Sequence, residues 1–290
     1  MEENAKMPGT PGILYLCATP IGNLEDMTYR AVRILGEVGL IAAEDTRHTR
    51  QLLAHYDIHT RLTSYHEHNK QSKGPELIDY LLTGGDLACV SDAGLPGIAD
   101  PGSQLAELAI AAGIRVVPLP GANAALSALI CSGLDTTRFS FVGFLPRTAA
   151  KRRERLQEVS GQQETLLFYE APHHLRATLA ELLTELGDRP AVLARELTKK
   201  FEEFRRGSLS ELVHYYETAE PRGEFVIVVA GAAALAVSQA PAASRQPAEL
   251  VQELMAGGLD KKAAMREAAR QLNISRRDVY QAVLAAEKQA

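Results

Sequence analysis

Two patterns of apolar and polar residues alternate over most of the chain. Short apolar runs such as ILYLC (13–17) and LACV (87–90) are strand-like, whereas longer segments such as TYRAVRILGEVG (28–39) repeat apolar residues at helical spacing. This alternation is typical of α/β layers with a mostly parallel sheet. The expected strands cover 12–20, 40–45, 86–92, 114–121, 139–146, 164–172, 191–197 and 224–231, with an extended segment at 61–69. The expected helices cover 28–39, 46–56, 74–85, 103–113, 122–133, 148–159, 173–187 and 209–218.

These elements group into two α/β lobes, 12–121 and 122–231, followed by a different kind of sequence. Residues 232–247 are rich in Ala, Pro, Ser and Gln and are expected to form a flexible linker. The last segment, 248–290, has only helical patterns, and Ser275 stands at the start of its final helix with capping-box spacing. We expect a small domain of the helix-turn-helix kind there.

Composition and charge narrow the class of protein. The chain has 290 residues, of which 46% are hydrophobic and 23% charged, as in a soluble globular protein with a sizeable core. Its net charge of −5 argues against non-specific nucleic-acid binding over the whole surface. The sequence has no apolar leader and no membrane-length apolar run, so we expect a cytoplasmic protein without membrane contact. Cys17, Cys89 and Cys131 lie in apolar segments and are expected to be buried, reduced thiols.

Four loops that follow expected strands are candidates for a ligand site. They are TPIGNLEDM (19–27), AEDTRHT (43–49), SDAGLPGIADPG (91–102) and PLPGANA (118–124). Ligands of open α/β sheets bind outside the carboxyl ends of strands, and glycine allows close approach to the main chain. Ordinary connections are the alternative, but four such loops at equivalent strand ends favour a site. The sequence contains neither a P-loop nor a G-x-G-x-x-G motif after the first strand, which disfavours kinases and Rossmann dehydrogenases.

Two of the loops carry titratable groups that suit catalysis. Glu44 and Asp45 end an expected strand and Arg47 follows, so a carboxylate can act as a base or orient a hydroxyl while the guanidinium clamps a phosphate or carboxylate. The alternative for Asp45 is a helix N-cap. His66 and His68 share one face if their segment is extended, which suits substrate contact or proton relay, or simply a surface strand. A metal site is least favoured there, because no third ligand stands at a recognisable spacing.

Basic residues gather in one predicted helix and at two other places. The segment LPRTAAKRRERL is the best candidate for contact with an RNA backbone in an acidic protein, although a solvated helix is the alternative. Arg276 and Arg277 open the last predicted helix, where a recognition helix meets phosphates or bases; a helical appendage used for dimerisation is the alternative. Lys199 lies in a segment of alternating charges that is by default a solvated face. The RNA-binding candidates are Arg147, Lys151, Arg152, Arg153, Lys199, Arg276 and Arg277.

Taken in order, the loops resemble those of the tetrapyrrole methylase superfamily, whose two α/β lobes hold S-adenosylmethionine in the cleft between them. The resemblance covers nearly all of 12–231. It rests on LYLCATPIGNLEDMTYRAVRIL, AEDTRHTRQLL, SYHEHN, VSDAGLPGIADPG, VVPLPGANAALSAL, FVGFLPR, LLFYEAPHHL, LARELTKKFEEFRRG and GEFVIVVAG. It is strongest to the bacterial branch that methylates the ribose 2'-hydroxyl of a cytidine in 16S rRNA of the 30S subunit. That likeness implies an S-adenosylmethionine-dependent rRNA methyltransferase that forms a homodimer and needs no metal.

The resemblance also implies roles for particular residues. The 93–99 loop would line the methionine and ribose part of the cofactor, and strand ends of the second lobe would hold the adenosine. Members with tetrapyrrole substrates usually carry Gly-Asp-Pro in the third loop, where this chain has Gly94-Leu95-Pro96. The expected cofactor-binding residues are Thr19, Pro20, Ile21, Gly22, Gly94, Leu95, Ile98, Ala99, Asn123, Ala124, Tyr169, Leu197, Glu224 and Phe225. The expected catalytic residues are Glu44, Asp45, Arg47 and His66.

Two other functions remain open at this point. The chain can methylate a small molecule such as a corrin precursor, although the missing aspartate in the third loop and the basic helix speak against it. It can also be a ligand-sensing regulator that binds DNA through 248–290.

Overall fold

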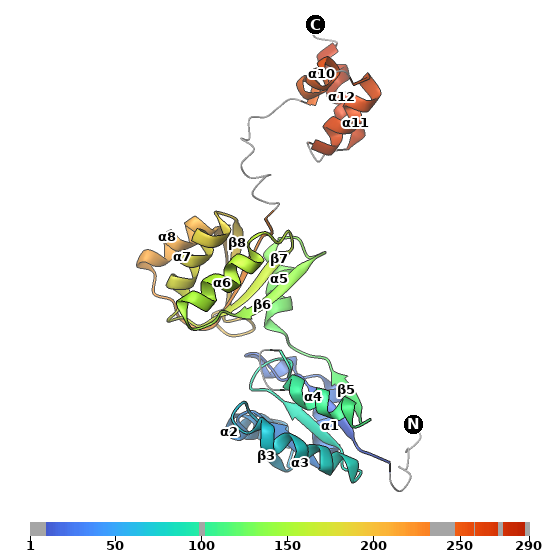
Figure 1. Cartoon of the computed structure of the whole chain (residues 1–290), viewed down its shortest axis with the longest axis vertical. Helices are drawn as coiled ribbons and strands as arrows, with labels where there is room; N and C mark the ends of the chain where they lie inside the picture. The colour runs from blue at the N-terminus through green and yellow to red at the C-terminus, as the bar shows by residue number, and fades with distance from the viewer. Residues whose placement is uncertain (1–9, 99–101, 233–246, 258, 272–274, 288–290) are drawn as a thin grey trace. The chain divides into compact units, whose positions relative to one another are not determined.

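The computed structural model describes residues 10–98, 102–232, 247–257, 259–271 and 275–287 (Figure 1). Its contacts divide the chain into two compact units, Met1–Leu235 and Ala236–Ala290. The larger unit contains two five-stranded sheets with their helices, and the described part of the smaller unit contains helices alone. Each unit is described separately below.

The first sheet consists of five parallel strands in the order β3-β2-β4-β1-β5. β2 and β4 are buried at every position, which explains why their sequences LIAA and LACV have no polar alternation. The strands are β1 (Ile13–Cys17), β2 (Leu40–Ala43), β3 (Leu62–Ser64), β4 (Leu87–Val90) and β5 (Arg115–Leu119). The helices beside them are α1 (Tyr29–Glu37), α2 (Thr46–His55), α3 (Lys70–Leu82) and α4 (Gly102–Ala111), and η1 (Leu24–Asp26) is a short 3-10 turn.

Helices cover both faces of this sheet. Leu77, Leu81 and Leu105 of α3 and α4 pack in one apolar cluster against the strands. Ile34 of α1 and Leu53 of α2 pack in a second cluster on the opposite residues of the same strands. The sheet is therefore closed on both faces, which leaves its edges and loops free for ligands.

The second sheet has the order β6-β7-β10-β8-β9 and is mixed. Only β6 and β7 run parallel; β10 is antiparallel to β7 and β8, and β9 is antiparallel to β8. The expectation of a mostly parallel sheet is therefore wrong for this half. The strands are β6 (Phe139–Phe144), β7 (Thr165–Glu170), β8 (Pro190–Arg195), β9 (Glu203–Ser208) and β10 (Phe225–Val229). The helices are α5 (Ala124–Ser132), α6 (Ala149–Ser160), α7 (Leu175–Leu186) and α8 (Leu209–Thr218).

β9 was not expected from the sequence, because EFRRGS carries three charges and one large apolar residue. It is an edge strand, and charged side chains are common on edges because they oppose pairing with another chain. α5 packs on one face of this sheet, and α6, α7 and α8 pack on the other.

Arg189 lies buried at the end of the second sheet where β8 begins and β10 ends. Its guanidinium donates hydrogen bonds to the carbonyl oxygens of Leu186 (2.8 Å), Ala230 (3.4 Å) and Ser160. It thus joins the ends of α6 and α7 to the residue after β10. Burial lowers its pKa.

The smaller unit contains α10 (Pro247–Ala256), α11 (Lys261–Gln271) and α12 (Arg276–Glu287) around an apolar cluster that includes Ala264, Ala268 and Val279. The Asp260 carboxylate accepts the Ala263 N–H (2.8 Å) at the start of α11. Ser275 Oγ accepts the Asp278 N–H (3.2 Å) and donates to its carboxylate (2.7 Å), so it caps α12.

The three cysteines differ in their burial. Cys17 and Cys89 are buried, but Cys131 is exposed, because it lies near the C-terminal end of α5 on the side away from the sheet. The prediction that all three thiols are buried is wrong for Cys131.

No helix within the described residues is long and apolar enough to cross a membrane.

Replacement of Arg189 by Met should lower the free energy of unfolding by about 2–4 kcal/mol, because three buried carbonyl oxygens lose a charged donor. Urea unfolding followed by tyrosine fluorescence measures this change. Arg155→Met is the matched control. Arg155 is exposed, and Glu158 (2.7 Å) is its one ion-pair partner among the described residues, so its stability change should stay within about 0.5 kcal/mol. Equal unfolding midpoints for the two variants would contradict the structural role of Arg189.

Candidate functional site

A cleft of about 350 Å³ is lined by strand ends of both sheets. Its volume lies within the roughly 300–1,000 Å³ typical of small-molecule sites. The lining residues are Ile21, Glu44, Ser91, Asp92, Ala93, Gly94, Leu95, Ile98, Asn123, Ala124, Phe144, Tyr169, Glu170, Ala171, Ala194, Glu196, Leu197, Lys199, Glu224, Phe225 and Val226.

The loops after β1 and β4 are bound to each other on the first-sheet side of this cleft. Thr19 and Gly94 exchange two backbone hydrogen bonds (2.9 and 3.0 Å), and Thr19 Oγ1 donates to the Ser91 carbonyl (3.0 Å). Thr19 is 3% exposed and does not line the cleft. Gly94 has a φ of +82°, a value that favours glycine, and its N–H is already used by Thr19. The bridge therefore shapes this wall, and Leu95 and Ile98 supply its apolar surface.

The loop after β5 runs close to β1 and leads into α5. A Cβ on Gly121 would lie 2.7 Å from the Cβ of Ala18, so only glycine fits there without movement. Asn123 Oδ1 accepts the Leu126 N–H (2.8 Å) and caps α5. Because Asn123 and Ala124 line the cleft, the N-terminal end of α5 lies at it, and the partial positive charge there suits an anionic group.

The wall from the second sheet is aromatic and apolar. Tyr169 at the end of β7 packs edge-to-face with Phe141 and Phe144 of β6, at centroid distances of 5.1 and 5.4 Å. Burial raises the pKa of Tyr169, and this effect outweighs the hydrogen bond with the Ala125 backbone, which alone would lower the pKa. The Tyr169 hydroxyl therefore stays protonated. Leu197 and Phe225 add apolar surface beside it.

Three charged residues form a cluster on the same wall. Lys199 Nζ donates to Glu196 Oε1 (3.0 Å) and to Glu224 Oε2 (2.9 Å). Burial alone would lower the pKa of Lys199, but its hydrogen bonds to Glu224 and Glu196 raise it, so the ammonium persists. Burial likewise opposes ionisation of Glu196, yet the Glu224 N–H and Lys199 hold its pKa below the usual value.

The backbone around this cluster is strained. Glu196 and Thr198 both have positive φ, at 50° and 66°, which is uncommon for residues other than glycine and clusters at functional sites. A Cβ on Gly22 would lie 2.3 Å from Lys199 Cγ, so the loop after β1 passes directly over this turn. The two walls of the cleft are therefore in contact at Gly22.

The two acids that end β2 differ in their surroundings. Glu44 lines the cleft, whereas Asp45 caps α2 and binds the guanidinium of Arg47 through both carboxylate oxygens (2.7 and 3.2 Å). The hydrogen bonds from the Arg47 side chain and backbone hold the pKa of Asp45 well below its usual range. Asp92 Oδ1 accepts the Asp45 N–H (3.0 Å), which ties the β2 loop to the β4 loop. Of the two acids, only Glu44 lines the cleft.

His66 lies just beyond β3, outside the cleft lining. The backbone N–H of His66 donates to Asn69 Oδ1 (2.8 Å). The ring Nδ1 is buried without a partner among the described residues. Its ring meets that of His68 at a centroid distance of 6.0 Å. Within the described part of the chain, no three His, Cys, Asp or Glu side chains gather as metal ligands.

The structure thus brings many of the expected site residues to one cleft. Thr19, Pro20, Gly22, Asp45, Arg47 and His66 were also expected in the site but do not line the cleft, and Ala99 is outside the described residues. The residues expected in the cofactor or catalytic site that line the cleft are Ile21, Glu44, Gly94, Leu95, Ile98, Asn123, Ala124, Tyr169, Leu197, Glu224 and Phe225. Lys199, which the sequence predicted as an RNA contact, lines the same cleft. Ala93 belongs to the 93–99 loop that was expected at the cofactor. The lining residues that were not expected individually are Ser91, Asp92, Phe144, Glu170, Ala171, Ala194, Glu196 and Val226. Most of these residues lie at the end of an expected strand or just after it. This position in the sequence was the signal that could have identified them as part of the site.

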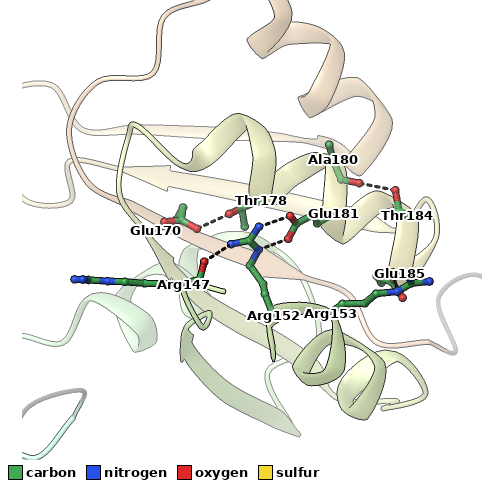
Figure 2. A network of polar contacts seen from close by, with 9 residues as sticks. All are labelled: Arg147, Arg152, Arg153, Glu170, Thr178, Ala180, Glu181, Thr184 and Glu185. Atoms are coloured by element: carbon green, nitrogen blue, oxygen red, sulfur yellow. Dashed lines mark hydrogen bonds and ion pairs between the residues drawn. The ribbon is translucent and has the colours of Figure 1, made fainter. Parts of the chain in front are cut away.

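Two arginines of the basic helix α6 pair with acids of α7, as Figure 2 shows. Arg152 binds both carboxylate oxygens of Glu181, and Arg153 lies 3.0 Å from Glu185. In Figure 2 the Arg147 side chain extends away from this network. Arg147 and Lys151 are exposed, and no described residue pairs with either side chain. The side chains of Arg276 and Arg277 lie outside the described part of the structure.

The charges of the lining residues show whether the cleft suits a methyl donor with a positive sulfur. Among its described lining residues, acids outnumber the single lysine, and the acids Glu44, Asp92 and Glu224 come from both walls. A negative, mostly apolar cleft stabilises a cationic organic group, and the N-terminal end of α5 suits its carboxylate. The residues present therefore fit S-adenosylmethionine.

Comparison with known proteins agrees with this geometry. The family described as Tetrapyrrole (Corrin/Porphyrin) Methylases matches residues 13–213. The chain is 50% identical to "Ribosomal RNA small subunit methyltransferase I" of Halalkalibacterium halodurans, over 93% of each protein. It is 47% identical to the protein of the same name from Bacillus subtilis, over 93% of this chain and 94% of the relative.

Solved structures with the same fold are more distant in sequence. Uroporphyrin-III-C-methyltransferase from Thermus thermophilus aligns with a TM-score of 0.52 at 22% identity, over 78% of this chain and 98% of that one. Cobalt precorrin-4 methyltransferase aligns with a TM-score of 0.57 at 14% identity, over 79% and 99%. These likenesses concern the fold alone. Because the family match covers most of the chain and near-full-length relatives are about half identical, the chain belongs to the tetrapyrrole (corrin/porphyrin) methylases.

Proposed function

We propose that this chain methylates the ribose 2'-hydroxyl of a cytidine in 16S rRNA of the small ribosomal subunit. As a family member it is a methyltransferase that uses S-adenosylmethionine. The observation that carries the proposed substrate is the near-full-length identity to relatives named as small-subunit rRNA methyltransferases. We also propose that the protein is cytoplasmic and forms a homodimer, with lobes at 12–121 and 122–231 and a helical tail at 248–290. Most of the linker expected at 232–247 lies outside the described residues.

The proposed reaction requires alignment and a proton acceptor. When bound, the donor supplies a methyl carbon that its positive sulfur already activates. Alignment of the acceptor oxygen by the cleft walls can contribute several of the roughly 7–11 kcal/mol that correct positioning provides. A ribose hydroxyl is too weak an acid to ionise at neutral pH, so a nearby base should add about 10²–10⁴-fold.

Glu44 is the residue that we propose as this proton acceptor. It lines the cleft on the side that carries Leu95 and Ile98. The hydrogen bond from the Asp45 N–H to Asp92 fixes the peptide next to Glu44, so its position is set by two strand-end loops. Asp45, with a strongly lowered pKa and both oxygens on Arg47, is a poor base and an anchor for that guanidinium.

The RNA contacts that we propose are divided between several elements. Arg147 and Lys151 at the start of α6 keep free, exposed cations for phosphates, while Arg152 and Arg153 mainly join α6 to α7. Arg276 and Arg277 stand at the first turn of α12, where we propose a further phosphate contact.

The direct test incubates the purified chain with S-adenosylmethionine labelled in its methyl group and with 30S subunits that lack the modification. We expect label in 16S rRNA that is recovered as 2'-O-methylcytidine after digestion to nucleosides. Label on a base, or none in RNA, would reject the proposal.

Glu44→Gln should lower kcat by about 10²–10⁴-fold while the Kd for S-adenosylmethionine changes little, because the proton acceptor is lost and the cleft is kept. Single-turnover methylation and calorimetric titration measure the two quantities. Asp45→Asn decides between the neighbouring acids. A loss of turnover in Asp45→Asn with normal turnover in Glu44→Gln would assign the base to Asp45.

Lys199→Met should raise the Kd for S-adenosylmethionine by roughly tenfold, about 1.4 kcal/mol, because Glu196 and Glu224 lose the cation that holds them together. RNA affinity should change little. Lys200→Met is the matched control, since Lys200 is exposed, lies over the Phe201 ring and forms no ion pair with any described residue. A loss of RNA affinity with normal cofactor binding would instead place Lys199 on the RNA surface.

A further inference from the structure

A second hollow lies on the first lobe, between α2 and the start of β3. Its volume is about 520 Å³. The residues that line it are Arg50, Leu53, Ala54, Ile58, His59, Thr60, Arg61 and Leu62. None of them belongs to the cleft described above.

The hollow has an apolar floor and a basic rim. Leu53 and Ile58 are buried at 3% and 8% exposure, and Ala54 and Leu62 continue this apolar surface. Arg50 and Arg61 are exposed on the rim, and no described residue forms an ion pair or hydrogen bond with either guanidinium.

The polar groups beside the two arginines are already engaged. Thr60 Oγ1 donates to the Leu35 carbonyl (2.6 Å), and the nearby acid Asp57 lies 3.0 Å from His59 Nε2. The free cations of the hollow therefore have no neighbouring carboxylate of their own. This contrasts with Arg152 and Arg153 of α6, which are paired with acids of α7.

The position of the hollow relates it to the cleft. α2 begins directly after Glu44 and Asp45, at the cleft, and Ala54 follows eight residues after its first residue. At 1.5 Å per helical residue, this separation along the helix is about 12 Å. A stacked nucleic-acid strand rises about 3.4 Å per nucleotide, so the hollow lies about three to four nucleotides from a residue held at Glu44.

We propose that this hollow binds a nucleotide of the RNA strand that flanks the methylated residue. Arg50 and Arg61 bind its phosphates, and the floor at Leu53, Ala54 and Ile58 receives the unstacked base or its ribose. Single-stranded RNA is generally bound through cation contacts to its backbone and through stacking of its bases on aromatic rings or guanidinium planes. Here the guanidiniums of Arg50 and Arg61 are the groups that can supply both kinds of contact. The inference rests on the proposed function, because it assigns a further contact to the same RNA substrate.

The test measures binding of the full-length double variant Arg50→Gln/Arg61→Gln to unmodified 30S subunits at several salt concentrations. We expect affinity to fall by roughly tenfold and the slope of log K against log salt to decrease by about 1.4, which corresponds to two phosphate contacts at about 0.7 each. Binding of S-adenosylmethionine should be unchanged. The matched control is Arg33→Gln/Arg222→Gln, which removes the same charge from exposed arginines that are paired with Glu37 and Glu220.

Ala54→Leu tests the hollow itself, since it fills the floor and leaves both guanidiniums in place. We expect weaker 30S binding with an unchanged salt slope. Wild-type affinity in this variant, or an equal loss in the double variant and its charge control, would overturn the inference. Wild-type chain that does not methylate 16S rRNA would reject the proposed function and this inference together. Normal methylation by wild type with normal binding by Arg50→Gln/Arg61→Gln would reject the inference alone.

Discussion

All five strands of the first sheet run parallel, and this shared direction is the constraint on which the site depends. It places the loops after β1, β2, β4 and β5 at one edge, although they are far apart in the sequence. The Thr19–Gly94 bridge and the bond from the Asp45 N–H to Asp92 then fix these loops to one another. Their apolar and acidic groups can therefore converge on one ligand without large loop motion.

The second sheet completes the cleft in spite of its different topology. Phe225 at the start of β10 pairs with Glu170 at the end of β7 and with Arg195 at the end of β8, so antiparallel strands bring a beginning and two ends to the same edge. The strained turn at Glu196 and Thr198 and the Lys199 ion cluster lie at that edge. The chain thus combines a rigid, loop-built wall with a wall whose charges are held in place by one lysine.

The sequence was sufficient for features that depend on local patterns. Buried runs such as LACV predicted strands, and the loops after them located Gly94, Leu95 and Asn123 at a cleft. It was insufficient where long-range contacts decide. Charged EFRRGS gave no sign of β9, because this strand lies at the edge of the sheet and none of its residues is buried. The partners of Arg152 and Arg153 lie on α7, about thirty residues further along the chain. From the sequence alone, the arginines of α6 therefore looked unpaired. The roles of Glu44 and Asp45 were separable only through Arg47 and Asp92.

The most direct measurement of the central claim is a crystal structure of this chain with S-adenosylmethionine bound. Density for the donor is expected in the cleft between the two sheets, in contact with Leu95 and Asn123 on one wall and Tyr169 and Leu197 on the other. Donor density at any other place on the chain, with this cleft filled only by solvent, would contradict it.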